Sequence, residues 1–124
     1  QDGKPDRRRY SITRAGRELL EAWLAEPPTT LPPSKNAALL KLFFSGSMEN
    51  EGILRLLEAQ LVLHREQLKR YEGETRQIIE DTVEATGLTR EGSMWELVRE
   101  LGEAHERAYV DWLERAIKRV RQLP

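Results

Sequence analysis

The sequence contains no cysteine, only two histidines and only two phenylalanines among its 124 residues. Without cysteine it has no disulfide and no thiolate metal site, which favours a reducing compartment, so we expect a cytoplasmic protein. No apolar run approaches the roughly 20 residues of a membrane-spanning helix, and we expect no membrane partner. The chain also lacks a glycine-rich phosphate loop, a nucleophile elbow and the paired histidines of a zinc-protease helix. We therefore expect no catalysis, no bound metal and no cofactor.

The charge is unevenly spread along the chain. The formal net charge is −1, yet residues 1–17 carry six basic and two acidic side chains. The remainder is therefore acidic and would repel nucleic acid. Any contact with a polyanion is expected at the basic N-terminal end.

Apolar residues recur at three- and four-residue steps nearly everywhere after Thr13, which predicts an all-α fold. A first helix is expected from Arg14 to Glu26, with Thr13 as its N-cap. The stretch PPTTLPP, residues 27–33, predicts a stiff extended connector. A second helix is expected over residues 34–45.

Two longer helices are expected in the rest of the chain. The third starts near Ser47 and runs to about Glu84. The fourth opens at Ser93, because Ser93 and Glu96 have the spacing of a capping box, and it continues almost to the C-terminus. Gly87 and Gly92 bracket the connection between the two.

The third helix carries a heptad seam. Its members, which we expect to form a dimer interface, are Leu54, Leu57, Leu61, Leu68, Tyr71 and Ile78. A helix of thirty-odd residues is roughly 45–55 Å long, more than so small a body can bury. The two long helices could also pair antiparallel within one chain, but that pair would leave its apolar edges exposed to water. We therefore expect a homodimer in which long antiparallel helices form a bundle.

The last helix carries an aromatic cluster, formed by Trp95, His105, Tyr109 and Trp112. Two interpretations stay open, because both require the same residues at the same spacing. The rings either fill the core or dimer interface, or they line a pocket for a small planar hydrophobic effector. Trp95 lies about 15 Å along the axis from His105, so it can join the pocket only from a second chain across an antiparallel pairing.

The basic N-terminal stretch has the pattern of a strand. Pro5 and Asp6 signal a turn, after which Tyr10 and Ile12 alternate with polar residues. A single strand is not stable alone, so its partner is expected before Gln1. This alternation, followed by a capped helix, argues against a disordered tail.

Three stretches together resemble a known family: GKPDRRRYSITRAGRELLEAWLAEPP (residues 3–28), LLKLFFSG (39–46) and YVDWLERAIKRV (109–120). They resemble the PadR family of bacterial transcriptional regulators. Residues 34–124 resemble the virulence-activator-type C-terminal domain of its longer members. The resemblance implies an N-terminal winged-helix domain that binds DNA and a helical C-terminal domain that dimerises it.

The resemblance divides the chain into three parts. Residues 1–13 would be a β-strand remnant of the wing, residues 14–33 the connecting helix and linker, and residues 34–124 the dimerisation and effector domain. The resemblance assigns DNA contacts in the intact parent to Lys4, Arg7, Arg8 and Arg9. It also implies a phenolic or flat hydrophobic effector. A recognition helix is absent, so we expect a fragment whose full-length parent alone binds DNA specifically.

A different functional class also fits the sequence. The chain would then be a helical protein–protein adaptor without DNA binding, whose basic end contacts an acidic partner.

Overall fold

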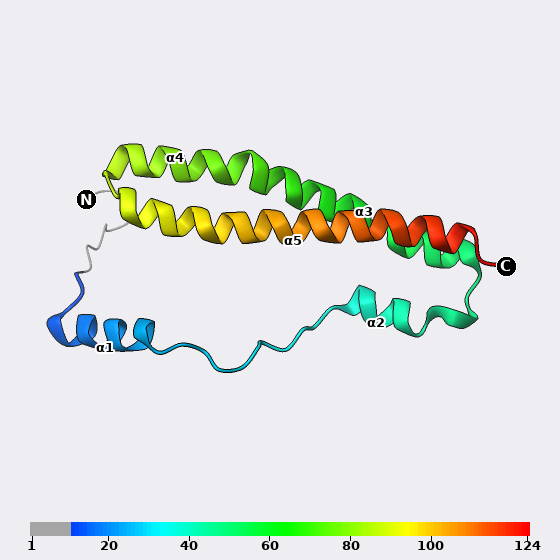
Figure 1. Cartoon of the computed structure of the whole chain (residues 1–124), viewed down its shortest axis with the longest axis horizontal. Coiled ribbons are helices and arrows are strands. Elements are labelled where there is room, and N and C mark those ends of the chain that lie inside the picture. Colours follow the sequence, from blue (N-terminus) through cyan, green and yellow to red (C-terminus); the bar gives the residue numbers. More distant parts are fainter. Residues whose placement is uncertain (1–10) are drawn as a thin grey trace, which may run out of the picture. The chain divides into compact units, whose positions relative to one another are not determined.

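The computed structural model describes residues 11–124. They divide into two units, with the boundary in the sequence between Lys35 and Asn36. The described residues form helices and no strand, so the predicted all-α class is confirmed over this range (Figure 1). The wing strand, expected within residues 7–13, falls mostly outside the described range, and residues 11–13 are not in a strand. Lys4, Arg7, Arg8 and Arg9 also lie outside it.

The first unit contains helix α1 (Arg14–Ala25). The Thr13 hydroxyl accepts a hydrogen bond from the backbone N–H of Gly16 at 3.0 Å, which confirms Thr13 as the N-cap. The helix ends before the Pro27–Pro28 pair, because a residue that precedes proline is disfavoured in the α region. Residues 27–35 contain neither helix nor strand, as the proline-rich composition predicts.

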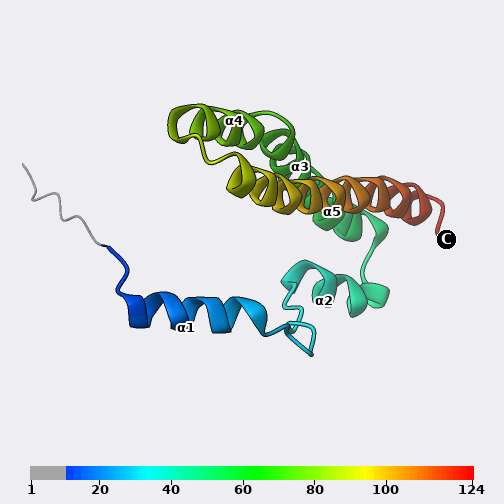
Figure 2. The ribbon, with the colours of Figure 1, turned by 60° about the vertical axis from the view of Figure 1, so that its left-hand side comes forward.

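The second unit contains α2 (Ala37–Phe43), a short 3-10 turn (Ser45–Ser47), α3 (Asn50–Glu72), α4 (Glu74–Thr86) and α5 (Thr89–Arg121). Figures 1 and 2 both show α5 alongside α3 and α4. Along α3, Glu58 is joined to Arg121 and Arg65 to Glu114, so α3 and α5 run in opposite directions. None of the helices within residues 11–124 is both long and apolar enough to cross a bilayer.

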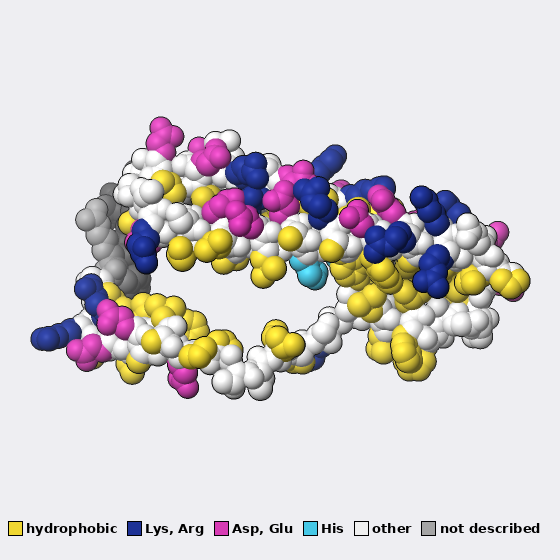
Figure 3. Space-filling model, in the orientation of Figure 1, with side chains coloured by type: hydrophobic (Ala, Val, Ile, Leu, Met, Phe, Trp, Pro, Cys, Tyr) yellow, Lys and Arg dark blue, Asp and Glu magenta, His cyan; other side chains and the backbone are white. Residues whose placement is uncertain are grey.

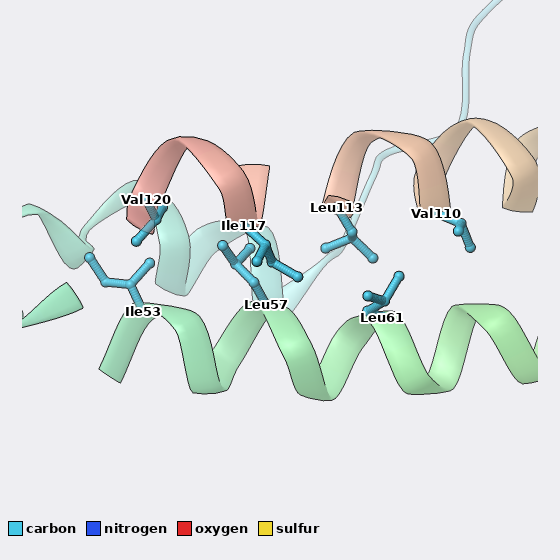
Figure 4. Close-up of a cluster of buried hydrophobic side chains, with 7 residues drawn as sticks. All are labelled: Ile53, Leu57, Leu61, Val110, Leu113, Ile117 and Val120. Carbon is cyan, nitrogen blue, oxygen red and sulfur yellow. The ribbon is translucent and has the colours of Figure 1, made fainter. Parts of the chain in front are cut away.

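The apolar core lies between α3 and the C-terminal half of α5 (Figure 4). It is formed by Ile53, Leu57 and Leu61 of α3 and by Val110, Leu113, Ile117 and Val120 of α5. Leu113 is the most enclosed of these, with 1% of its surface exposed. Burying each such side chain stabilises the fold by about 1.5–3 kcal/mol.

The predicted seam of α3 is used largely within the chain. Leu57 and Leu61 lie in the core, and Leu54 and Leu68 pack against it. The two residues nearest the α3–α4 junction differ: Tyr71 is half-buried, whereas Ile78 is exposed. The helix is covered because α5 supplies a matching apolar face. A role for these residues between two chains stays a prediction.

The expected single helix from Ser47 to Glu84 is interrupted at Gly73, which separates α3 from α4. Glycine weakens a helix by about 1 kcal/mol, and a bend there needs another donor for the carbonyls of the preceding turn. Arg99 of α5 supplies it, donating to the Tyr71 carbonyl at 2.8 Å. The same guanidinium donates to the carboxylates of Glu96 and Glu103. These hydrogen bonds satisfy a buried cation, raise the pKa of Arg99 and lower that of Glu96.

The predicted start of the last helix at Ser93 is wrong, because α5 begins four residues earlier at Thr89. Gly87 adopts a left-handed conformation with φ 73° and reverses the chain directly after α4. Ser93 lies inside the helix, where its hydroxyl donates to the Thr89 carbonyl. Gly92 is buried against α4, since a Cβ there would lie 2.3 Å from Cγ2 of Val83. Its role is close packing rather than helix initiation.

Candidate functional site

A network of polar and aromatic side chains centres on Tyr109 of α5. Its ring stacks on His64 of α3, with centroids 3.9 Å apart and planes 11° apart. Trp112 meets the same ring edge-on at 5.8 Å. The Tyr109 hydroxyl accepts a hydrogen bond at 2.9 Å from Nδ2 of Asn36, whose Oδ1 caps α2 by accepting from the N–H of Leu39. Tyr109 therefore connects α3, α5 and the start of α2.

The network continues from His64 to a buried carboxylate. Nδ1 of His64 lies 2.5 Å from Oε2 of Glu106. Both side chains are largely enclosed, and no buried side-chain polar atom in residues 11–124 lacks a partner. His105 lies at the exposed end of this group, with its Nδ1 3.9 Å from the other oxygen of Glu106. His64 is therefore packed and hydrogen-bonded within the chain.

A hollow of about 360 Å³ lies next to the network. Its lining comes from Leu39 of α2 and from His105, Ala108, Tyr109 and Trp112 of α5. This size falls within the range of small-molecule pockets, and the aromatic walls with a few polar groups are typical of such sites. The rings of Tyr109 and Trp112 and the imidazole of His105 are the groups that this hollow presents. Residues 11–124 contain no group of three or more side chains arranged to hold a metal.

Three of the four predicted pocket residues meet here: His105, Tyr109 and Trp112. Trp95 does not line the hollow, as expected from its distance along the helix. The sequence analysis missed Asn36 and Glu106 and did not connect His64 with Tyr109. Asn36 and Tyr109 are 73 residues apart and His64 and Glu106 are 42 apart, so no local pattern signals either pair.

A second heptad series on α5 is largely exposed and lies on a different face from the buried core residues; its last member, Trp112, also packs against the core. We call it the α5 stripe; it consists of Met94, Val98, Leu101, His105, Ala108 and Trp112. Val98 and Leu101 are 74% and 72% exposed, although both are aliphatic. In Figure 3, hydrophobic side chains follow the edge of the long C-terminal helix. Exposed apolar patches are typical of interaction surfaces.

The sequence of residues 34–121 matches the family model described as virulence activator alpha C-term. The chain belongs to this family. The match starts just before α2 and ends with α5, so it contains the Tyr109 network and the α5 stripe. This family is the C-terminal domain found in PadR-like regulators. No curated protein has a sequence that matches the chain.

Membership of the virulence activator alpha C-terminal family supports the resemblance to regulators at the level of this domain. It indicates the C-terminal domain of a transcription regulator. The winged helix and its DNA contacts stay predictions, because the match begins at residue 34.

Proposed function

We propose that this domain joins two copies of a PadR-like transcription regulator through the α5 stripe. The observation that carries the proposal is a row of mostly apolar, largely exposed side chains in heptad spacing, on a helix whose opposite face is already packed. Heptad rows of this kind pair with other helices. We place the interface on the stripe rather than on the predicted α3 seam, because Leu57 and Leu61 are buried within one chain.

The stripe is self-complementary when a second copy lies antiparallel. Its members are placed symmetrically about residue 103, with Met94 and Trp112 nine residues to either side. Val98 and Ala108 are five residues away, and Leu101 and His105 are two. A two-fold axis at Glu103 therefore places Met94 of one copy opposite Trp112 of the other. It likewise places Val98 of one copy opposite the smaller Ala108 of the other. A two-fold interface requires this self-matching.

The charge of α5 favours the same orientation. Residues 89–103 carry four acidic and two basic side chains, whereas residues 107–121 carry five basic and two acidic ones. Antiparallel pairing places the acidic end of each helix beside the basic end of the other. It also opposes the helix dipoles, whereas parallel pairing would bring like charges together.

In a longer regulator, such a pairing would hold two DNA-binding domains at a fixed separation. A two-fold protein then matches an operator with two half-sites. In that setting Lys4, Arg7, Arg8 and Arg9 would contact phosphates or the minor groove. The family match favours this function over an adaptor without DNA binding.

The test is to place charge in the stripe. The double variant Val98→Glu/Leu101→Glu should be monomeric in sedimentation equilibrium and should keep the helical circular dichroism of the wild type. Both positions are exposed within one chain, so the fold tolerates glutamate there. Between chains, the same substitution buries four carboxylates near the two-fold axis.

A matched control lies on α3. Val62→Glu/Leu63→Glu changes the same residue types at positions 58% and 57% exposed. This control should leave the wild-type dimer intact. A dimer that survives the α5 double variant, or a wild-type chain that is monomeric at high concentration, contradicts the proposal.

The hollow beside Tyr109 supports a second role, which is the binding of a small planar hydrophobic or phenolic effector. Antiparallel pairing about Glu103 would bring the partner's Trp95 towards this hollow, completing the predicted set of rings. Planar phenols should then quench tryptophan fluorescence saturably in the wild type and much less in Trp112→Leu. Quenching that is unchanged by the substitution would place the ligand elsewhere.

A further inference from the structure

A separate groove, also lined by Trp112, lies over the C-terminal end of the core. It has a volume of about 370 Å³. Its floor and walls are apolar and come from three helices: Leu42 of α2, Leu57 of α3, and Trp112 and Val120 of α5. Leu123 lies at its end. Its lining shares Trp112 alone with the Tyr109 hollow.

The groove is elongated along α5. Its lining runs from Trp112 to Leu123, which corresponds to roughly 16 Å of helix axis. An unbranched chain suits a shape of this length better than a compact ring does. The partly exposed Leu42 and Trp112 offer an apolar surface to such a chain, above the buried Leu57 and Val120.

Two arginines, Arg115 and Arg119, border the groove. Arg115 and Arg119 are one helical turn apart, so their side chains lie on the same face. Within residues 11–124 neither forms an ion pair, whereas the nearby carboxylates Glu114 and Glu58 are held by other arginines. A guanidinium offers a planar fork of donors that matches a carboxylate. The groove therefore combines an apolar trough with two donors of positive charge at its edge.

We infer that this groove binds a straight-chain amphiphilic carboxylate, with its tail along the apolar floor and its headgroup at Arg115 and Arg119. Charge complementarity selects an anionic head over a cationic or neutral one, and the length of the groove selects a linear tail. The inference does not depend on pairing through the α5 stripe, because one chain supplies the whole lining.

The experiment is equilibrium dialysis of the full chain with radiolabelled decanoate below its micelle concentration. Decanol and decyltrimethylammonium serve as neutral and cationic comparators with the same tail, and acetate as the head without the tail. Wild type should bind decanoate at least about tenfold more tightly than decanol, since hydrogen bonds to a charged group contribute more than neutral ones. It should bind the cation and acetate more weakly still.

Two double variants separate the groove from general electrostatics. Arg115→Gln/Arg119→Gln should lower decanoate affinity about tenfold or more and leave decanol unchanged. Lys118→Gln/Arg121→Gln removes the same charge from the same end of α5 but not from the groove, and should change decanoate affinity less than about threefold. Equal losses in the two double variants overturn the inference, as does wild-type binding of decanol as tight as that of decanoate.

A third variant tests the tail site without disturbing the core. Leu123 is about half exposed, so Leu123→Ser should fold normally and weaken decanoate and decanol alike. Unchanged affinity for both ligands would contradict a tail along the groove. The monomeric Val98→Glu/Leu101→Glu chain should bind decanoate as the wild type does, so a failed groove and a failed dimer give different results.

Discussion

Helix α5 carries two heptad series that face different surroundings. The inner series repeats every seven residues and is buried throughout, at Gly92, Arg99, Glu106, Leu113 and Val120. The α5 stripe repeats just as regularly but is largely exposed. Hydrophobicity therefore does not tell which series is buried. The aliphatic Val98 and Leu101 of the stripe face solvent, whereas the charged Arg99 and Glu106 of the inner series are buried. Regular spacing indicates that a face meets another helix, but not whether that helix belongs to the same chain.

The inner series also changes character along its length. Towards the C-terminus it packs on α3 through Leu113 and Val120. Towards the N-terminus it uses a glycine contact, a buried arginine and the glutamate that pairs with His64. Apolar packing tolerates small shifts, whereas hydrogen-bonded charges require one geometry. The polar half therefore fixes the position of α5 against the bend between α3 and α4.

The largest difference between the two faces should appear on truncation of a leucine. Leu113→Ala removes a side chain that is 1% exposed and should lower the free energy of unfolding by about 2–5 kcal/mol. Leu101→Ala makes the same chemical change on the stripe and should cost no more than about 0.5 kcal/mol in dilute, monomeric protein. Urea unfolding followed by circular dichroism measures both. Equal losses would mean that the stripe is buried within one chain.

Close packing at Gly92 gives the next largest contrast. Gly92→Leu forces a side chain against Val83 and should cost about 1–3 kcal/mol. The neighbouring exposed position provides the control, since Ser93→Leu should stay within about 0.5 kcal/mol of the wild type. The same unfolding experiment compares them. A Gly92→Leu variant as stable as Ser93→Leu would show that α4 does not hold its place against α5.

The presence of the helices was predictable from local sequence signals, whereas the residues of the candidate site were predictable only in part. The Thr13 cap and the prolines at 27 and 28 bound α1 through neighbouring atoms, which sequence patterns report well. The capping-box spacing at Ser93 predicted the wrong start for α5, because such a spacing can also occur inside a helix. The chain has already turned at the left-handed Gly87. At the bend at Gly73, the carbonyl of Tyr71 accepts a hydrogen bond from Arg99. Arg99 is 26 residues from Gly73, so local sequence does not reveal this donor.

The candidate site shows the same limit. His105, Tyr109 and Trp112 are neighbours on one helix, and their spacing alone predicted that they share a surface. Asn36 and His64 reach Tyr109 only because three helices pack together. The seam of α3 was recognised, and a second chain was expected to cover it, because one small body was not expected to bury so long a helix. Within the chain, α5 covers Leu57 and Leu61 of this seam.

The link between α2 and Tyr109 lies at the border of the two faces and should have a moderate effect. Asn36→Ala removes the N-cap of α2 and the hydrogen bond to Tyr109, and should cost about 0.5–2 kcal/mol locally. Hydrogen exchange should speed up in α2 and remain slow in the core of α3 and α5. Tyr109→Phe keeps the cap but removes the shared hydrogen bond, so its effect on α2 should be smaller. Equal effects would indicate that the tyrosine contact, rather than the cap, orders this helix.

The smallest effect on the free energy of unfolding is expected from the contact between Glu96 and Arg99, and this effect should depend on pH. Hydrogen bonds from Arg99 hold the pKa of Glu96 below its ordinary value of 4.5. A carboxylate with a lowered pKa in the folded state adds stability above its unfolded pKa and loses it as the pH falls through the folded value. Wild type should therefore be more stable than Glu96→Gln at neutral pH, and the difference should shrink once the pH falls below 4.5. Glu100→Gln, on the same helix but without an ion pair in residues 11–124, is the control for removing one negative charge from α5 at neutral pH. Denaturant titrations from pH 7 to pH 3 measure it, and a gap between wild type and Glu96→Gln that widens towards acid would show that Glu96 is not held by Arg99 as a carboxylate.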